Sequence, residues 1–382
     1  MRETLKILWM NWRDIRHPLA GGAEVYTHEV AKRLATRGHE IILATSRPPG
    51  LPQREEIDGY TVIRRGGRLT VYTAARKTYH ELKRKGWRPD IVIDEINTIP
   101  FMTPLYVKEP IAVLIHQLCR DCWSHLVGPL HPLAWRLEKQ LHRPYIRAAR
   151  SGRLRAVITV SEETAQDLAE LGYPQNLITI AYNGLDPALL QRCQPTGKED
   201  LVVYIGRIAS YKRLQDLLEA WSIVEKQHPT AWLIIAGRAD PSYLKKLLER
   251  AAHLGLHRAS FYTNISEEEK LRLLSKAKLL VYTSTREGWG RGVYEAAACH
   301  TPTIAYNIPG LREAVKDKET GILVEPGDTK ALAQSIKKLL EDNSLREQLA
   351  EKAYTRAKNY TWSTTAERFE TMLKEVMNND DY

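Results

Sequence analysis

The sequence predicts an α/β protein of two domains, each built around a parallel sheet. Short apolar runs alternate with amphipathic stretches of helical period, which is the pattern of repeated strand–helix units. The same alternation of apolar runs and amphipathic stretches begins again in the second half of the chain. At 382 residues the chain also exceeds what one hydrophobic core usually holds, so we expect two domains of ordinary size.

In the first domain, residues 1–185, the apolar runs are expected to be strands. They are Lys6–Trp9, Ile41–Ala44, Ile91–Ile93, Ile111–Ile115 and Ala156–Val160. Between the first two lies Glu24–Arg37, in which apolar side chains recur with helical spacing up to Gly38. Turn residues without a sustained period, 183–200, mark the joint to the second domain.

In the second domain, residues 186–361, strands and helices alternate again. The expected strands are Leu201–Ile205, Ala231–Ala236, Ser260–Tyr262, Leu279–Tyr282 and Thr303–Ala305, and the expected helices are Leu214–Gln227, Ser242–Leu254, Ser266–Lys276, Gly292–Cys299 and Asp328–Asp342. A last helix, Thr364–Met377, can pack on either domain, so a return of residues 362–382 to the first domain is one of two arrangements. Ligands of open parallel sheets bind beyond the carboxyl ends of the strands, and with two such domains facing each other we expect the site in the cleft between them.

The composition limits the class of protein. With 43% hydrophobic and 27% charged residues and no low-complexity tract, the chain is expected to fold throughout. No window of 18 uncharged apolar residues occurs, and the N-terminus carries no signal-peptide cleavage site, so we expect a cytoplasmic protein that does not span a membrane. The four cysteines, Cys119, Cys122, Cys193 and Cys299, do not suggest a disulfide framework, and a reducing compartment is expected.

A formal net charge of +10 favours anionic partners such as nucleotide phosphates, an acidic lipid surface or nucleic acid. Between Arg136 and Arg155 seven basic residues stand against Glu138 alone, interleaved with leucines and aromatic residues. Such a segment can lie on the anionic inner face of the cell membrane or dock an acceptor. A solvated helix face whose leucines turn to the core is the alternative.

Gly21 and Gly22 directly precede the first expected helix. Glycines at that place let a bound group approach the main chain, and the free N–H groups and dipole of the helix favour a phosphate. A plain tight turn would use the same residues.

Arg207 follows the first strand of the second domain, and Lys212 precedes the next helix, so both cations are expected at the carboxyl end of that strand. An arginine fork and a lysine point charge can clamp a diphosphate, although each residue can also be an ordinary surface cation. No Asp-x-Asp triplet, the usual cue for a metal that bridges a diphosphate, occurs in the chain. We therefore expect no metal and no cofactor, with the side chains neutralising that charge.

Glu287 and Glu295 lie on either side of the start of an alanine-rich helix. Glu287 is expected in the loop after the strand Leu279–Tyr282, and Glu295 in the first turns of the helix. A carboxylate can accept hydrogen bonds from two neighbouring hydroxyls of a ribose or sugar, so the pair can hold both ends of a nucleotide sugar. For Glu295, compensation of the helix dipole is the alternative.

His116, Cys119, Cys122 and His125 are spaced three apart and have the residue types of a zinc site. Zinc ligands are usually split between two separated pairs, however. We favour two small buried thiols beside an active-site histidine.

Six segments, taken in this order, resemble the retaining glycosyltransferases of family 4, which transfer a sugar from a nucleotide-diphosphate donor. The segments are GGAEVYTHEVAKRLATRGHEI, VSEETAQDL, AYNGLD, GRIASYKR, LIIAGR and EGWGRGVYEAAACHTPTIAYNIPGLREAV, and they span nearly the whole chain. The resemblance implies the GT-B fold, in which two Rossmann-like domains face each other across a cleft.

The resemblance also implies roles for residues of both domains. Arg207 and Lys212 would stabilise the departing diphosphate, and Gly22, beside Gly21, would bring its main chain to the donor phosphate. His116 is similar to the first-domain histidine that contacts the donor sugar, although the residues after it depart from the commonest form. The LIIAGR segment adds Gly237 and Arg238 to the residues expected near the donor.

The last segment supplies the remaining implied contacts. Glu287 would lie near the transferred sugar and Glu295 would bind the ribose. Main-chain N–H groups of Gly288, Trp289 and Gly290 would face the sugar and phosphate, and Arg291 would add a cation near the phosphates. Family members often have Phe in place of Trp289 and Gly in place of His300, and neither departure changes the implied class.

The resemblance therefore implies a retaining hexosyltransferase that uses a UDP- or GDP-sugar and a hydroxyl acceptor on a glycan, a lipid or a small molecule. A sugar-nucleotide epimerase or a phosphorylase of the same fold is the nearest alternative. A glycoside hydrolase also uses two carboxylates, but it would not need Arg207 and Lys212. A basic nucleic-acid-binding protein would explain the charge, but no recognition motif of that kind occurs, so we expect no nucleic-acid partner.

Overall fold

The computed structural model divides the chain into two compact units. It describes residues 4–119, 123, 127–193 and 197–378. Unit 1 comprises Met1–Gly184 and Trp362–Tyr382, and unit 2 comprises Leu185–Thr361. The chain therefore leaves unit 1 once and returns to it for the last helix.

Unit 1 is built on an eight-stranded sheet with the order β3-β4-β2-β1-β5-β6-β7-β8. The strands are β1 Lys6–Met10, β2 Glu40–Thr45, β3 Arg54–Ile57, β4 Tyr60–Arg64, β5 Ile91–Glu95, β6 Ile111–Ile115, β7 Leu154–Thr159 and β8 Ile178–Ile180. All neighbours pair in parallel except β3 and β4. The inner strands are buried on both faces, which explains their continuous apolar runs.

The antiparallel pair β3–β4 lies at the sheet edge and was not among the expected strands. Asp58 and Gly59 join the two strands and have φ values of 45° and 87°. Positive φ at both central residues is typical of the tight hairpin turn that Asp-Gly favours. Since β3 carries charged residues and is partly exposed, its apolar signal is weak.

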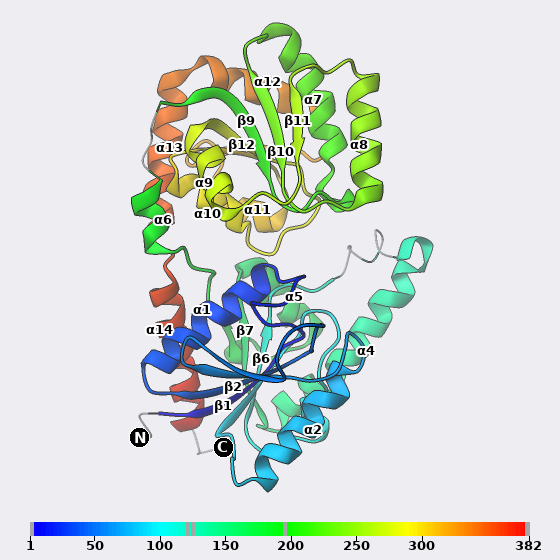
Figure 1. Ribbon diagram of the computed structural model, residues 1–382, viewed down its shortest axis with the longest axis vertical. Helices are drawn as coiled ribbons and strands as arrows, with labels where there is room; N and C mark the ends of the chain where they lie inside the picture. Colours follow the sequence, from blue (N-terminus) through cyan, green and yellow to red (C-terminus); the bar gives the residue numbers. More distant parts are fainter. Residues whose placement is uncertain (1–3, 120–122, 124–126, 194–196, 379–382) are drawn as a thin grey trace. The chain divides into compact units, whose positions relative to one another are not determined.

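Helices cover both faces of the unit 1 sheet (Figure 1). They are α1 Gly22–Thr36, α2 Val71–Arg84, α4 His131–Arg150, α5 Glu162–Leu171 and α14 Trp362–Asn378, with 3₁₀ turns at Thr103–Leu105, Gly128–Leu130 and Gln175–Leu177. Helix α14 packs on α1, and Phe369 stacks on Trp9 of β1 with 5.2 Å between ring centroids. Glu370 adds an ion pair to Arg37 at 2.6 Å, and its other oxygen lies 3.2 Å from His39 Nε2.

Unit 2 is built on a six-stranded, fully parallel sheet with the order β11-β10-β9-β12-β13-β14. The strands are β9 Glu199–Ile205, β10 Trp232–Ala236, β11 Ala259–Tyr262, β12 Ala277–Tyr282, β13 Thr303–Tyr306 and β14 Gly321–Val324. Every strand expected from the sequence overlaps an observed strand, and the two α/β units confirm the predicted fold class.

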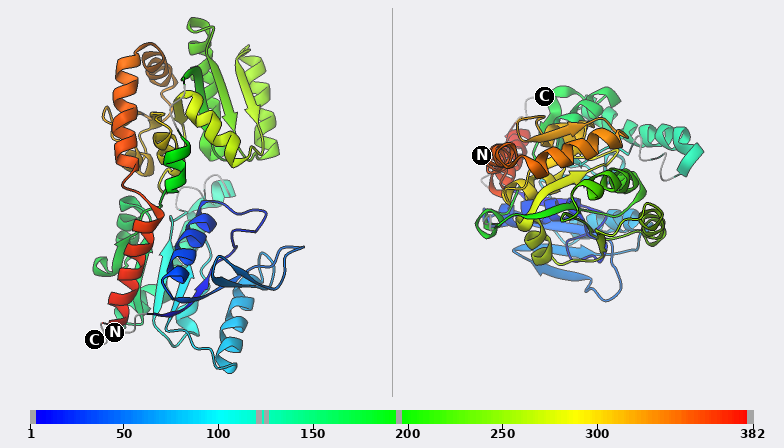
Figure 2. Two further views of the ribbon diagram at one scale, coloured as in Figure 1. Left: turned by 60° about the vertical axis from the view of Figure 1, so that its left-hand side comes forward. Right: turned by 90° about the horizontal axis from the view of Figure 1, so that it is seen from above.

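The helices of unit 2 lie on both faces of its sheet (Figure 2). They are α6 Pro187–Arg192, α7 Leu214–Gln227, α8 Pro241–His253, α9 Glu267–Lys276, α10 Arg291–Ala298, α11 Pro309–Ala314, α12 Thr329–Glu341 and α13 Asn343–Ala357, with a 3₁₀ turn at Ser210–Lys212. Asp240 and Ser266 cap α8 and α9 by accepting main-chain N–H groups of the first turn, so local side chains fix where these helices begin.

A disulfide joins Cys193 to Cys299 and corrects the expectation of unpaired cysteines. Both residues are buried, and 106 residues separate them in sequence. The bond ties the segment after α6 to the end of α10. Spacing along the chain could not reveal it, because the two cysteines meet only after unit 2 has folded.

Candidate functional site

Lys212 and Glu287 form the centre of a charged cluster at the carboxyl ends of β9 and β12. The Lys212 ammonium donates to Glu287 Oε1, and Ser284 Oγ donates to the same oxygen at 2.8 Å. Thr283 Oγ1 donates to the Lys212 carbonyl at 2.8 Å, which joins the two loops. Only 7% of Lys212 is exposed. Two residues that the sequence analysis singled out separately thus meet across 75 residues of chain.

The environment keeps the buried Lys212 charged. Burial by itself would lower its pKa, but the Glu287 carboxylate and Tyr211 together outweigh burial, and the pKa lies above the ordinary value for lysine. The nitrogen also lies 4.9 Å from the Tyr211 ring centroid and 5.9 Å from that of Tyr282. Lys212 is therefore a fixed positive charge at this end of the sheet.

Arg207 lies on the same side of the sheet, directly after β9, and is exposed. Tyr204 Oη donates to its carbonyl at 2.8 Å. Its positive charge acts on Lys212 and opposes the effect of Glu287 on the lysine pKa. Within the described ranges its guanidinium makes no ion pair, so its donors can face a ligand.

Glu295 lies in the second turn of α10 and is held by two cations. Arg291 Nε lies 3.0 Å from Oε1, and Lys270 Nζ of α9 lies 3.1 Å from Oε2. Burial would raise the pKa of Glu295, but Arg291 and Lys270 keep it below its ordinary value. Arg291, expected near the phosphates, thus pairs with Glu295 instead. Lys270 was not predicted, because one lysine in a charged helix carries no signal of its own.

The buried Tyr282 hydroxyl donates to the Ile205 carbonyl at 2.5 Å, and the charges of both carboxylates act on it. Burial raises the pKa of Tyr282 well above its ordinary value, and the charges of Glu287 and Glu295 raise it further. Both carboxylates therefore act on one side chain at the end of β12. Residues Lys212, Glu287 and Glu295 belong to one electrostatic cluster.

Glycines let the main chain turn tightly around this cluster. Gly237 has φ of 140°, and a Cβ there would lie 2.0 Å from the Gly206 carbonyl oxygen. Gly290 has φ of 72° and precedes the first residue of α10. The Gly237 N–H, expected near the donor, already donates to the Tyr262 carbonyl at 2.9 Å, and the carbonyl of half-buried Arg238 accepts from Ile208.

Trp289 packs inside unit 2 rather than presenting its side chain to solvent. It is 3% exposed and stacks on Tyr294 with 3.9 Å between ring centroids, and Tyr360 lies edge-on at 5.6 Å. Trp289 could therefore meet a ligand only through its main chain, as could the half-buried Gly288. His300 has φ of 50°, which explains why glycine suits this position.

In unit 1, Gly21 and Gly22 stand at the start of α1. The Gly21 N–H donates to Glu24 Oε2 at 2.6 Å, and Arg13 Nε lies 2.9 Å from Glu24 Oε1. A Cβ on Gly22 would meet nothing within 4 Å, so space is open beside its main chain. The first N–H groups of a helix have no acceptor within the helix and favour an anion.

His116 follows β6 and contacts a buried carboxylate. Its Nε2 lies 3.1 Å from Glu95 Oε1 at the end of β5. Of the other residues weighed as zinc ligands, Cys122 and His125 lie outside the described residues, and the Cys119 N–H donates to Glu138 Oε1 at 2.8 Å. Glu95 was not predicted as a site residue, because a glutamate within a strand carries no local signal.

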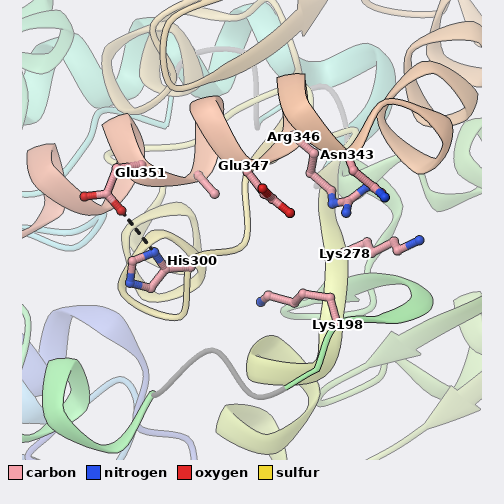
Figure 3. Close-up of a pocket in the computed structure, with 8 residues that line it drawn as sticks. Lys198, Lys278, His300, Asn343, Arg346, Glu347 and Glu351 are labelled. Atoms are coloured by element: carbon pink, nitrogen blue, oxygen red, sulfur yellow. Dashed lines mark ion pairs between the residues drawn. The ribbon is translucent and has the colours of Figure 1, made fainter.

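A separate pocket of about 680 Å³ lies at the amino ends of the unit 2 strands (Figure 3). It is lined by Lys198, Lys278, His300, Asn343, Arg346, Glu347, Ala350 and Glu351. Lys198 precedes β9 and Lys278 lies near the start of β12, so the pocket opens at the sheet edge opposite to Arg207 and Glu287. Its charges are mixed, and His300 lies 3.6 Å from Glu351.

Comparison with known proteins accounts for nearly the whole chain. Residues 20–189 match the family model described as Glycosyltransferase Family 4, and residues 190–356 match the model described as Glycosyl transferases group 1. Glycogen synthase from Mycobacterium tuberculosis strain H37Rv is 28% identical, over 95% of this chain and 92% of its own length.

Two solved structures share the fold. Sucrose-phosphate synthase from Thermosynechococcus elongatus superposes with a TM-score of 0.80 and 20% identity, covering 98% of this chain and 99% of that one. HepE from Anabaena, solved with UDP-glucose, gives 0.71 and 20%, covering 97% and 100%. The predicted GT-B fold and the family resemblance are confirmed.

Proposed function

We propose a reaction and a set of residue roles for this chain, which belongs to family 4 of the glycosyltransferases. The proposed reaction moves a hexose, with retention of configuration, from a nucleotide-diphosphate donor to a hydroxyl acceptor and requires no metal. The observation that supports this reaction most directly is the cluster of Arg207, Lys212 and Glu287 at the carboxyl ends of β9 and β12.

The cluster suits the departure of a diphosphate. As the bond from C1 of the sugar to the phosphate oxygen breaks, negative charge grows on the leaving group, and Lys212 and Arg207 stabilise that charge. The acceptor oxygen bonds to C1 on the same face, and its proton passes to the leaving phosphate. In this scheme no side-chain base is required, and no metal has to bridge the phosphates.

The remaining roles follow the family resemblance. Glu295, fixed by Lys270 and Arg291, accepts hydrogen bonds from the ribose hydroxyls, and Glu287 faces the transferred sugar. In unit 1, the main chain at Gly22 contacts a donor phosphate and His116 contacts the sugar. The UDP-glucose complex of HepE supports a UDP-sugar as the first donor to test.

Thermal unfolding with UDP-, GDP- and ADP-sugars tests the donor class. A donor that binds only the folded protein raises the unfolding temperature, and about 100 Kd of donor contributes about 2.7 kcal/mol. We expect one class to stabilise the wild type and to lose much of its effect in Glu295→Gln. If no nucleotide sugar stabilises the protein, or if Glu295→Gln responds as the wild type does, the proposed site is wrong.

Products separate the proposal from an epimerase. A transferase needs a hydroxyl acceptor for net turnover to a new glycoside, whereas an epimerase converts the donor alone. Conversion of the nucleotide sugar to an epimer without an acceptor would favour the alternative. Anomeric coupling constants of the new glycoside, compared with those of the donor, decide between retention and inversion.

A second part of the proposal is contact with an anionic membrane through α4. Leu130, Leu133 and Leu137 are 63%, 65% and 61% exposed and recur at helical spacing, so the alternative in which the leucines face the core is wrong for them. The N-terminal half of α4 projects from the unit 1 sheet (Figures 1 and 2). No helix among the described residues is long and apolar enough to cross a membrane.

Charge on α4 complements such a surface. Arg136, Lys139 and Arg143 are exposed, whereas Glu138 turns inward and accepts from Trp123 Nε1 at 2.8 Å. The exposed face of α4 therefore combines leucines with cations, and Glu138, the acidic residue of this helix, is buried. A membrane contact of this kind fits a lipid-linked acceptor.

Sedimentation with vesicles of phosphatidylglycerol or phosphatidylcholine tests this surface. We expect the wild type to bind the anionic vesicles and Leu133→Glu/Leu137→Glu to lose that binding. Leu248→Glu, at a leucine of α8 that is 49% exposed, is the matched control and should bind as the wild type does. Equal binding by the double variant, or no wild-type binding, would contradict the membrane role.

A further inference from the structure

We propose that Glu95 is a positioning residue that fixes the His116 ring by its Nε2–H and leaves Nδ1 as an acceptor for a substrate hydroxyl. The inference rests on the proposed function only for the statement that His116 contacts the sugar. Its structural part depends on the hydrogen bonds of Glu95, which lies at the end of β5.

Glu95 is completely buried, and both of its oxygens have hydrogen-bond partners. Oε2 accepts from Trp9 Nε1 at 2.9 Å and from Thr27 Oγ1 at 2.5 Å. Oε1 lies 3.1 Å from His116 Nε2. An indole N–H can only donate, so Oε2 must be an acceptor, and the contact with His116 is left to Oε1.

The contacts of Glu95 are those of a carboxylate, since two donors reach Oε2 and a histidine nitrogen lies beside Oε1. A buried carboxylate is stable only when hydrogen bonds or a cation compensate its charge. No lysine or arginine of the described chain pairs with Glu95, and its one titratable neighbour within ion-pair distance is His116. An ionised carboxylate has no hydrogen to give, so the hydrogen between Oε1 and Nε2 must belong to the histidine.

Neighbouring aromatic rings restrict the imidazole in other directions. Tyr26 lies edge-on to the ring with 5.2 Å between centroids, and its hydroxyl donates to the Ala181 carbonyl at 3.1 Å. Trp362 of α14 also packs edge-on against Tyr26, with 5.8 Å between ring centroids. Thr164 Oγ1 donates to the His116 carbonyl at 3.3 Å. These contacts oppose a flip of the ring that would exchange its two nitrogens.

The consequence is a defined chemistry at the exposed nitrogen. His116 is 15% exposed, and its Nδ1 makes no hydrogen bond within the residues that the structure describes. When Nε2 carries the hydrogen of a neutral ring, Nδ1 has a lone pair. Such an atom recognises a hydroxyl that donates, and it repels a phosphate oxygen. We therefore assign His116 to a sugar hydroxyl and not to the diphosphate.

Two-bond ¹H–¹⁵N correlation spectra of the ¹⁵N-histidine-labelled full chain test the tautomer directly. The His116 signal is identified by its loss in His116→Asn. At about pH 8.5, where imidazoles are ordinarily neutral, the wild type should show His116 as the Nε2–H form. An Nδ1–H form or a doubly protonated ring would overturn the proposal without any variant of Glu95.

Glu95→Gln provides the second arm. Its amide N–H₂ would donate to Nε2 while its oxygen still accepts from Trp9, so the variant should convert His116 to the Nδ1–H form. Thr27→Val is the matched control, because it removes a donor to Glu95 but leaves the histidine contact, and it should keep the Nε2–H form. An unchanged tautomer in Glu95→Gln overturns the proposal.

Turnover shows whether the tautomer matters to the reaction. With a donor that binds the wild type, Glu95→Gln should lower kcat/KM roughly tenfold to 100-fold. The double variant Glu95→Gln/His116→Asn should be no slower than His116→Asn alone, because Glu95 acts through the histidine. Additive losses would overturn the positioning role. The spectra are recorded without a nucleotide sugar. They therefore test the tautomer of His116 even if the proposed transfer reaction is wrong.

Discussion

The ammonium of Lys212 and the carboxylate of Glu287 form an ion pair that joins the loops after β9 and β12. A hydroxyl also donates a hydrogen bond to each partner. Ser284 donates to the Glu287 carboxylate, and Thr283 donates to the Lys212 carbonyl. The pair is neutral as a whole, and Arg207 adds an exposed positive charge at this end of the sheet. A diphosphate would therefore meet one fixed cation and one exposed cation.

Lys212→Ala should lower turnover far more than it lowers donor binding. A cation that meets charge developed in the transition state contributes about 10²–10³ in rate. Steady-state kinetics with separate kcat and KM for the donor measure the effect. Lys245→Ala, at an exposed lysine of α8, serves as control and should leave both constants unchanged. A near-normal kcat in Lys212→Ala would contradict the assigned role.

Glu295→Gln should mainly weaken donor binding. The substitution removes charge-assisted hydrogen bonds to the ribose and leaves Lys270 and Arg291 without their shared carboxylate. Loss of one such bond costs about 1.5–3 kcal/mol, which is roughly tenfold to 100-fold in Kd. Calorimetric titration with the donor checks this, and Glu249→Gln on the exposed face of α8 is the control. Unchanged affinity would rule out the ribose contact.

Lys198 should make the stability of unit 2 depend on pH. Burial, aided by the charge of Arg346, lowers its pKa from 10.5 to about 7, although Nζ donates to the Cys299 carbonyl and to Thr301 Oγ1. The unfolded chain therefore binds more protons between pH 7 and 10.5, and this group's contribution to the free energy of unfolding rises with pH across that window.

Urea unfolding of the wild type and Lys198→Met across this window measures the effect. One pKa unit corresponds to about 1.4 kcal/mol, and because the amine is only partly enclosed we expect a difference on the order of 2 kcal/mol. The wild type should gain stability relative to Lys198→Met as the pH rises. Parallel pH profiles for the two proteins would show that Lys198 titrates normally.

Phe369→Ala should destabilise unit 1. Phe369 is completely buried and stacks on Trp9 at an interplanar angle of 13°, so truncation leaves a cavity between α14 and β1. Large-to-small changes of this kind cost about 3–5 kcal/mol. Denaturant unfolding monitored by tryptophan fluorescence measures the loss, and Phe369→Leu should retain much of the stability. A loss below about 1 kcal/mol would mean that the site collapses around the missing ring.

Most of the parallel strands could be predicted because they are buried on both faces and read as continuous apolar runs. The strands that the sequence analysis missed are short or partly exposed. β8 has three half-buried residues, and β14 begins with Gly321. The β3–β4 hairpin did carry a signal, the pair Asp58-Gly59, and the strong charge of β3 obscured it.

The site residues that the sequence predicted share one property: each lies between a strand and the next helix, or in the first turns of that helix. Arg207 follows β9 and Glu287 follows β12, and neighbouring parallel strands end at the same edge. Lys270 and Glu95 could not be found in this way. Lys270 meets Glu295 across two elements, and Glu95 meets Trp9 across 86 residues. Such pairings depend on packing between elements, which no local pattern encodes.

The return of α14 to unit 1 affects how the chain is synthesised and folded. Unit 1 buries Phe369 and Met372, which a ribosome adds only after it has made all of unit 2. Unit 2 can therefore complete its core while the chain is still growing. In unit 1, Trp9 stays uncovered until Phe369 of α14 has been made. A nascent chain halted before residue 362 would present an apolar surface to chaperones, and release of the last helix would end that exposure.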